Sequence, residues 1–417
     1  MSDGTTAGPL DGVKVLDLSM VVSGPICSRM LADLGADVIK VEPPTQDILR
    51  FTLPHVGDDD VSVYFTWANA GKRAITVDIR TPEGQDIVRR LAMTSDVVLE
   101  NFRPGLLAKY GLDADTLRAA QPRLVYCSVN GWGSENSWSE RRAYAAMVQA
   151  EVGRVELDAR LRGKPPELST HVDGDITPGL LAVSGIVAAL FRRERTGQGD
   201  HLDVSMAEAL LYTDEWTTSE LIGYRGRRIP DTWLYPVVET ADGRQAAFMG
   251  SPHGRLIEIA AALSDETVEP TDSYDDAVQI LRDLVRRLPD FPTLEARLEP
   301  FGFLVGEIRT VSEIAGTPWA EEREVFTEVE PQHHVSTKPF RSSSSTVAVQ
   351  GRAPRFGEHT REILTERLGL DAPALDALEA AGVITSREKV GDDALPHTMK
   401  DYLAGRRAES SGVPPGG

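Results

Sequence analysis

One carboxylate in the sequence stands at the predicted mouth of an apolar helix. Asp175 lies in the segment Gly174-Asp-Ile-Thr-Pro-Gly179, and the apolar residues 180–191 that follow predict the helix. A carboxylate with an ordinary pKa of about 3.9 is ionised at neutral pH, so it can act as a nucleophile without a general base. A helix N-terminus near Thr177 would help to keep it anionic. By themselves, however, these residues favour a plain N-cap role for Asp175.

The charge balance limits what the protein can bind. The 417 residues carry 44 basic and 64 acidic side chains, for a net charge of −20. A surface this negative repels nucleic acid and anionic membranes, so we expect neither as a partner. A polyanionic ligand would need a local group of basic side chains where it docks.

Composition indicates a soluble globular protein, with 41% hydrophobic and 26% charged residues. No uninterrupted apolar run approaches the roughly 20 residues of a membrane span. Residues 1–9 lack the basic and apolar regions of a signal peptide. Cys27 and Cys127 lie among apolar residues and predict buried thiols rather than a disulfide framework or a zinc site. We therefore expect a cytoplasmic protein without a bound metal.

The first half of the chain alternates β-branched runs with amphipathic stretches. This order predicts parallel βαβ units in an α/β, Rossmann-like domain, whose ligands bind beyond the carboxyl ends of the strands. No Gly-x-Gly-x-x-Gly or P-loop follows a strand, so the sequence does not support binding of a nicotinamide cofactor or ATP. The predicted strands are 13–19, 37–42, 74–79, 96–100, 124–129 and 201–204, with helices at 24–34, from 82 and at 180–191.

The rest of the chain predicts a second, smaller α+β domain. We expect a large domain over 1–223, a small domain over 224–330, and a return to the large domain over 331–417, with a disordered tail from about 409. A long helix should run from Ser205 to about Gly223, and residues 224–233 should connect the domains. Residues 237–249 predict a hairpin with Asp242-Gly243 at its turn, followed by helices between 256 and 298. Further helices should cover 360–381.

Read in order, several motifs are similar to the class III CoA-transferase family, also called the CaiB/BaiF family. The order and spacing of these motifs over most of the chain make the resemblance specific, although each motif alone is weak. They read Gly8-Pro-Leu-Asp-Gly-Val-Lys-Val-Leu-Asp-Leu18, Leu34-Gly-Ala-Asp-Val-Ile-Lys-Val-Glu42, Asn69-Ala-Gly-Lys-Arg73, Thr81-Pro-Glu-Gly84, Asp96-Val-Val-Leu-Glu-Asn-Phe-Arg-Pro-Gly105, Arg195-Thr-Gly-Gln-Gly199, Gly357-Glu-His-Thr360 and Glu379-Ala-Ala-Gly-Val383.

The resemblance implies a role for Asp175 beyond capping. Family members carry their nucleophilic aspartate in a segment that matches 174–179, so Asp175 is the implied nucleophile. It would move CoA from an acyl-CoA to a small carboxylic acid through a mixed anhydride and an aspartyl-CoA thioester. CoA takes part as a substrate, and no other cofactor is implied. Tyr144, Gly174 and Gly179 would line the substrate pocket.

The resemblance also implies a CoA path along the strand ends. The expected contacts, some of which would instead be ordinary surface charges, are Val21, Val22, Lys72, Val77, Arg80, Asn101, Phe102, Lys109 and Arg142. Family members form interlocked ring-like homodimers, so we expect a homodimer here. A mobile loop that covers the intermediates in the formyl-CoA transferase branch would fall near 249–254, where the Gly-rich match is poor.

Two positions depart from the family pattern. Ala145 follows Tyr144 where most members have an acidic residue, and Pro43 stands where formyl-CoA transferase offers an arginine to CoA. The first departure affects orientation of the acyl group, and the second removes one CoA contact. Two alternatives follow: a 2-methylacyl-CoA racemase of the same fold, or a CoA-binding protein without turnover. The racemase branch uses a His-Asp pair where this chain has Tyr144-Ala145, and these residues do not readily replace an acid/base pair.

Overall fold

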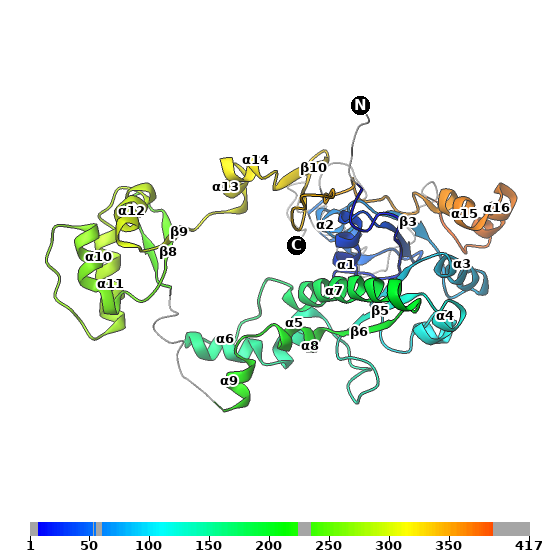
Figure 1. The fold of residues 1–417 in the computed structure, drawn as a ribbon, viewed down its shortest axis with the longest axis horizontal. Coiled ribbons are helices and arrows are strands. Elements are labelled where there is room, and N and C mark those ends of the chain that lie inside the picture. Colours follow the sequence, from blue (N-terminus) through cyan, green and yellow to red (C-terminus); the bar gives the residue numbers. More distant parts are fainter. Residues whose placement is uncertain (1–6, 53, 56–60, 224–234, 387–417) are drawn as a thin grey trace, which may run out of the picture. The chain divides into compact units, whose positions relative to one another are not determined.

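The computed structural model describes residues 7–52, 54–55, 61–223 and 235–386. The chain divides into two compact units (Figure 1). The first comprises residues 1–153, 168–217 and 324–417, and the second comprises 154–167 and 218–323. This second unit differs from the predicted small domain, 224–330, because it also includes 154–167 and 218–223 and ends at 323.

A six-stranded parallel sheet forms the centre of the first unit, in the order β3-β2-β1-β4-β5-β6. The order reverses between β1 and β4, and in open α/β sheets ligands bind at the carboxyl ends of the strands beside such a point. The strands are β1 (Lys14–Asp17), β2 (Asp37–Glu42), β3 (Arg73–Thr76), β4 (Val97–Glu100), β5 (Val125–Asn130) and β6 (His201–Ser205).

Alternating side chains of these strands fill a separate core on each face of the sheet. Val15 packs on one face with residues of α1 and α7, whereas Leu16 packs on the other with residues of α3, α4, α15 and α16. Both Cys27 and Cys127 are buried free thiols on the first face, as predicted. The helices are α1 (Ser23–Asp33), α2 (Val63–Asn69), α3 (Pro82–Met93), α4 (Ala114–Ala120), α5 (Ala145–Glu151), α7 (Asp173–Thr196), α8 (Met206–Tyr212), α15 (Thr360–Leu368) and α16 (Ala372–Ala380).

Helix α7 is the longest described element, and by length and composition alone it could span a membrane. Its inner side chains belong to the core: Ala182, Ile186 and Leu190 pack against the sheet together with α1. An apolar helix of this kind is typical of the interior of a soluble protein.

The long helix predicted from Ser205 to Gly223 is wrong, because the chain forms two short helices, α8 and α9 (Thr217–Leu221). The carboxylate of Asp214 accepts the backbone N–H of Trp216 at 3.0 Å. Such a local side-chain bond competes with the helical bond and interrupts the helix. The predicted connection at 224–233 and the predicted tail from 409 lie outside the described residues.

The second unit contains the predicted hairpin. Strand β7 (Val237–Glu239) pairs antiparallel with β8 (Gln245–Phe248), and Gly243 in the turn has a φ of +83°, which glycine adopts without strain. Strand β9 (Val305–Glu307) completes this sheet. The helices are α6 (Arg154–Arg162), α10 (Leu256–Leu263), α11 (Tyr274–Val285), α12 (Phe291–Leu298), α13 (Val311–Ala315) and α14 (Pro318–Glu322).

The last part of the chain returns to the sheet of the first unit. After strands β10 (Phe326–Glu330) and β11 (His333–Ser336), helix α15 packs on β3. Beyond α16, Ile384 forms a β-bridge with Val77, and the N–H of Asp78 donates to the carbonyl of Val383 at 2.8 Å. The segment directly after β3 is thereby fixed by residues that lie more than 300 positions later in the sequence.

Candidate active site

The loop between β1 and α1 lies at the point where the strand order reverses, and side chains from neighbouring strands hold it. The N–H of Met20 donates to Oδ1 of Asn101 at 2.8 Å, and Nδ2 of Asn101 donates to the carbonyl of Met20 at 2.7 Å. Nδ2 also donates to Oγ of Ser23 at 3.2 Å. The structure therefore brings together the ends of β1 and β4, where Val21, Val22 and Asn101 were predicted to lie.

Asp175 belongs to the first turn of α7, because the helix begins at Asp173 rather than near Thr177. Pro178 has no N–H to donate to the carbonyl of Gly174, so the helix tolerates a proline in its sixth position with the loss of one hydrogen bond. Asp175 is half-buried, and this burial raises the pKa of its carboxyl to about 6. At pH 7 roughly nine-tenths of such a group is still ionised.

Two glycines that flank Asp175 in the sequence allow other segments to approach helix α7 closely. A Cβ on Gly174 would lie 2.8 Å from Cα of Ala145, and a Cβ on Gly179 would lie 2.6 Å from the carbonyl oxygen of Ser23. The first turns of α7 therefore pack directly on the start of α5 and on the start of α1. The predicted pocket residues Gly174 and Gly179 have this close-packing role.

A small apolar cluster joins α7 to the β1–α1 loop. Val22 is buried in this cluster with Phe65, and Val21 and Ile176 pack against it. Since Ile176 follows Asp175 in the chain, the predicted nucleophile and the predicted pantetheine contacts lie in one region of the first unit.

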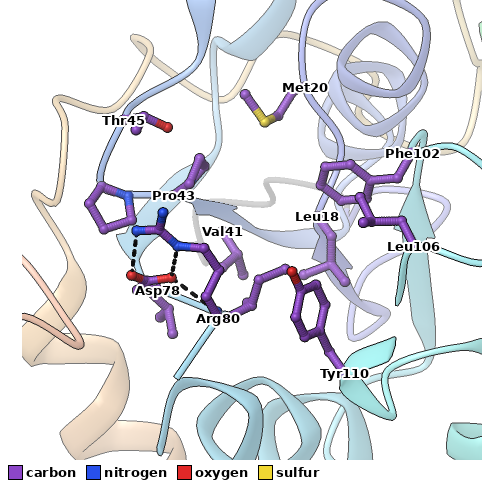
Figure 2. A pocket seen from close by; sticks show the side chains of 13 residues that line it. Leu18, Met20, Val41, Pro43, Thr45, Asp78, Arg80, Phe102, Leu106 and Tyr110 are labelled. Atoms are coloured by element: carbon purple, nitrogen blue, oxygen red, sulfur yellow. Dashed lines mark hydrogen bonds and ion pairs between the residues drawn. The ribbon is translucent and has the colours of Figure 1, made fainter. Parts of the chain in front are cut away.

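Next to this loop, a cavity of about 190 Å³ opens at the carboxyl ends of β1, β2, β3 and β4 (Figure 2). Figure 2 shows Arg80 and Asp78 at one side of the cavity and Phe102, Leu106 and Tyr110 at the other. Its walls are mainly apolar. The lining residues are Leu18, Met20, Val41, Pro43, Pro44, Thr45, Val77, Asp78, Ile79, Arg80, Phe102, Leu106 and Tyr110.

Arg80 supplies the positive charge of this cavity. Its Nε donates to Asp78 at 2.8 Å and its Nη2 at 2.7 Å, while its side chain remains 69% exposed. The hydrogen bonds from Arg80 lower the pKa of Asp78, which therefore stays ionised. The ion pair fixes the direction of the guanidinium but leaves part of it open to solvent, so an anionic group can approach it.

Of the other predicted contacts, Val77 and Phe102 line the cavity. Lys109 is exposed beside the lining residue Tyr110, and its side chain forms no ion pair within the described part of the chain. Arg142 is exposed on the loop between β5 and α5 and does not line the cavity. Tyr144, at the N-cap of α5, is 68% exposed.

Lys72 does not fit its predicted role in binding CoA. Its side chain is completely buried, and Nζ contacts Asp17 at 3.1 Å, Asn69 at 2.8 Å and the carbonyl of Pro25 at 3.0 Å. Burial lowers the pKa of Lys72 to about 8, although the Asp17 carboxylate opposes this shift. Lys72 supports the start of α1 from inside, where a phosphate does not reach.

Sequence reasoning missed a row of buried charges beneath the β1–α1 loop. Lys40 pairs with Asp47 at 3.0 Å, and Arg50 pairs with Glu42 at 2.6 Å, with all four side chains fully buried. Lys40 and Glu42 are buried in strand β2 beside the apolar residues Val38, Ile39 and Val41. Two charged side chains in a buried strand require internal partners of opposite charge. This requirement is the signal in the sequence from which the buried ion pairs could have been predicted.

The comparisons with known proteins agree with this architecture. The model of CoA-transferase family III matches residues 10–360. The chain is 32% identical to succinate–glutarate CoA-transferase of Agrobacterium fabrum over 86% of this chain and 95% of the relative. It is 31% identical to formyl-CoA:oxalate CoA-transferase of Streptomyces avermitilis, over 90% and 99% of the two chains.

A solved structure supports the same assignment. The crystal structure of a CaiB/BaiF family protein from Brucella suis superimposes with a TM-score of 0.77 and 31% identity, covering 87% of this chain and all of that one. The motifs, the parallel sheet and these matches agree, and the chain belongs to CoA-transferase family III, the class III CoA-transferases.

Proposed function

We propose that this enzyme transfers CoA from an acyl-CoA to a small carboxylic acid, with Asp175 as the covalent nucleophile. The observation that carries the proposal is the half-buried carboxylate of Asp175 in the first turn of α7, beside the close contacts of Gly174 and Gly179. At pH 7 the carboxylate is mostly ionised despite its raised pKa. Partial removal from water makes a carboxylate a better nucleophile than it is in bulk solvent.

The reaction would proceed by two exchanges on the same carboxyl group. An oxygen of Asp175 attacks the thioester carbonyl, and the C–S bond breaks to give a mixed anhydride and the CoA thiolate. The thiolate then attacks the aspartyl carbonyl, which releases the donor acid and leaves an aspartyl-CoA thioester. The acceptor carboxylate attacks this thioester, and the same steps in reverse give the new acyl-CoA and free Asp175. Each tetrahedral intermediate needs hydrogen-bond donors for its oxyanion.

The cavity beside the β1–α1 loop fits the adenine end of CoA. Its apolar walls, with Val77 and Phe102, suit a flat base, and the exposed guanidinium of Arg80 and the nearby Lys109 suit phosphate groups. Val21, Val22 and Asn101 would guide the pantetheine arm toward Asp175. The basic residues near this cavity would offset the repulsion that a net charge of −20 exerts on the anionic CoA.

We further propose a cytoplasmic homodimer. Large apolar side chains are exposed along the first unit: Tyr144, Leu180, Val187, Phe191 and Tyr212. A second copy of the chain would cover such residues. Sedimentation equilibrium of the purified protein tests this: a monomer at micromolar concentration contradicts the proposal.

Trapping tests the nucleophile directly. The enzyme is incubated with succinyl-CoA, or with oxalyl- or glutaryl-CoA as suggested by the names of the relatives, and hydroxylamine is added. We expect a hydroxamate on Asp175 by peptide mass spectrometry, and loss of CoA exchange in Asp175→Ala. Asp173→Ala, in the same helical turn, is the matched control and should keep its activity.

The outcomes separate the alternatives. Exchange that persists in Asp175→Ala refutes the proposed nucleophile. Deuterium incorporation at Cα of a 2-methylacyl-CoA without exchange identifies a racemase. Binding of CoA with neither reaction, across a panel of acyl-CoA donors and acids, identifies a binding protein.

A further inference from the structure

The β1–α1 loop contains a residue in an unfavourable backbone conformation. Val21 has a φ of +68°, in the left-handed region. A β-branched residue rarely adopts this conformation, because its Cβ crowds the backbone, and it persists only where the surroundings impose it. The hydrogen bonds that hold Val21 in this conformation therefore indicate the function of the loop.

Three successive residues of the loop are each held by a side chain from another element. The carbonyl of Ser19 accepts from Nζ of Lys40 at 2.7 Å. Asn101 binds both the N–H and the carbonyl of Met20. The N–H of Val21 donates to the carboxylate of Asp47, at 3.2 Å to Oδ1 and 3.1 Å to Oδ2.

Asp47 and Lys40 form one buried unit beneath the loop. Nζ of Lys40 lies 3.0 Å from Oδ2 of Asp47, and both side chains are completely buried. Burial lowers the pKa of Lys40, but the carboxylates of Asp47, Asp17 and Glu42 outweigh it and raise that pKa above its ordinary value. Lys40 binds the carbonyl of Ser19 and Asp47 binds the N–H of Val21, so the pair fixes both ends of the turn between Ser19 and Val21.

We infer that Asp47, with its charge balanced by Lys40, is a positioning residue for CoA transfer. It holds Val21 in the left-handed conformation and so sets where Met20, Val21 and Val22 stand. Met20 lines the cavity, and Val21 and Val22 pack with Ile176 beside Asp175. This inference rests on the proposed function, because it concerns the path of CoA between that cavity and Asp175.

The distinction to be tested is between positioning and simple support of the fold. Asp47 also accepts the N–H of Leu49 at 3.0 Å, at the start of the 3-10 helix η1 (Ile48–Phe51), so removing it will affect stability as well. Val21 offers a way to separate the two roles. Glycine adopts a positive φ without strain, whereas alanine keeps the Cβ that makes this conformation unfavourable.

The experiment compares Asp47→Ala, which removes both oxygens that accept from the N–H of Val21, with the double variants Asp47→Ala/Val21→Gly and Asp47→Ala/Val21→Ala. Each is measured for CoA dissociation constant by calorimetry, for kcat and KM of exchange, and for Tm. We expect Asp47→Ala to weaken CoA binding and to lower kcat/KM by about 10-fold to 100-fold, the size of effect that a misplacement of roughly 1 Å produces. Val21→Gly should restore most of both losses, whereas Val21→Ala should restore neither.

The inference is overturned if Val21→Gly and Val21→Ala change CoA affinity and kcat/KM equally, or if neither restores them, even if Tm changes. Should Asp47→Ala not fold, Asp47→Ala/Lys40→Met removes both buried charges and serves as the background for the same pair of Val21 variants. Binding of free CoA does not require the carboxylate of Asp175. A failure of the proposed chemistry would therefore leave the calorimetric comparison intact, and the two failures are distinguishable.

Discussion

Replacing Gly179 by alanine would insert a methyl group between α7 and α1. The new Cβ would lie 2.6 Å from the carbonyl oxygen of Ser23 and 2.5 Å from Cγ2 of Ile26, whereas ordinary contact begins at 3.4 Å. The backbone of Ser23 cannot rotate away as a side chain can, so the two helices must separate by about 0.8 Å at this point.

Gly185, six residues further along the same helix, provides a matched control. A Cβ there would meet Cδ1 of Leu202 at 3.3 Å, which is the end of a flexible side chain. Overpacking costs about 1–3 kcal/mol, and replacing glycine by alanine within a helix gains up to about 1 kcal/mol. Because the helical gain is common to both variants, Gly179→Ala should be less stable than Gly185→Ala by about 1–3 kcal/mol.

Activity should fall more than stability alone would explain. Asp175 lies one turn before Gly179, so separation of the helices moves it away from the β1–α1 loop. A displacement approaching 1 Å at a reacting group lowers rates by up to about 100-fold. Denaturant unfolding and CoA exchange at 25 °C, where both variants are folded, measure the two effects. The reasoning would be refuted if Gly179→Ala exchanged CoA at the wild-type rate and were as stable as Gly185→Ala.

Three further predictions concern charge. Since the pKa of Asp175 is about 6, kcat/KM should fall as pH decreases through 6, rather than near 4, and a pH–rate profile measures this. Burial raises the pKa of Glu100 to about 7, so the folded state binds the proton of this carboxyl more tightly than the unfolded state does. The free energy of unfolding should therefore decrease by up to about 3 kcal/mol as pH rises from 4.5 to 7. Thermal unfolding of Glu100→Gln, whose amide oxygen can still accept from the N–H of Phe102, should lack this decrease. Arg80→Ala should weaken CoA binding by about 1 kcal/mol, roughly fivefold, at low salt and less at high salt, as measured by calorimetry, because exposed charges are screened.

Local patterns predicted the elements of the sheet well. Strand β2 has the predicted bounds, Asp37–Glu42, because its β-branched run lies between a glycine-containing turn and Pro43-Pro44. The parallel arrangement followed from the alternation of strands and helices. The start of α7 was misplaced because proline usually occupies the first turn of a helix, whereas Pro178 stands in the sixth position.

The candidate site was predictable only where the motif names its residues. Asn101 contacts the β1–α1 loop, and Val77, Phe102 and Arg80 line the cavity, whereas their contacts with CoA stay predictions. The buried position of Lys72 could not be derived from sequence, because its partner Asp17 is 55 residues away and only the fold brings the two together. Asp47 was missed for the same reason, since its contacts with Lys40 and Val21 are not local.

The bridge between Val77 and Ile384 has a consequence for the growing polypeptide. One wall of the cavity, at Val77, is fixed by nearly the last described residues, so a nascent chain that has emerged only through β6 contains Asp175 but lacks the contacts that fix this wall. Contacts that span some 300 residues form late, because a long loop must close first. We therefore expect that a ribosome-bound fragment that stops before residue 360 does not retain CoA.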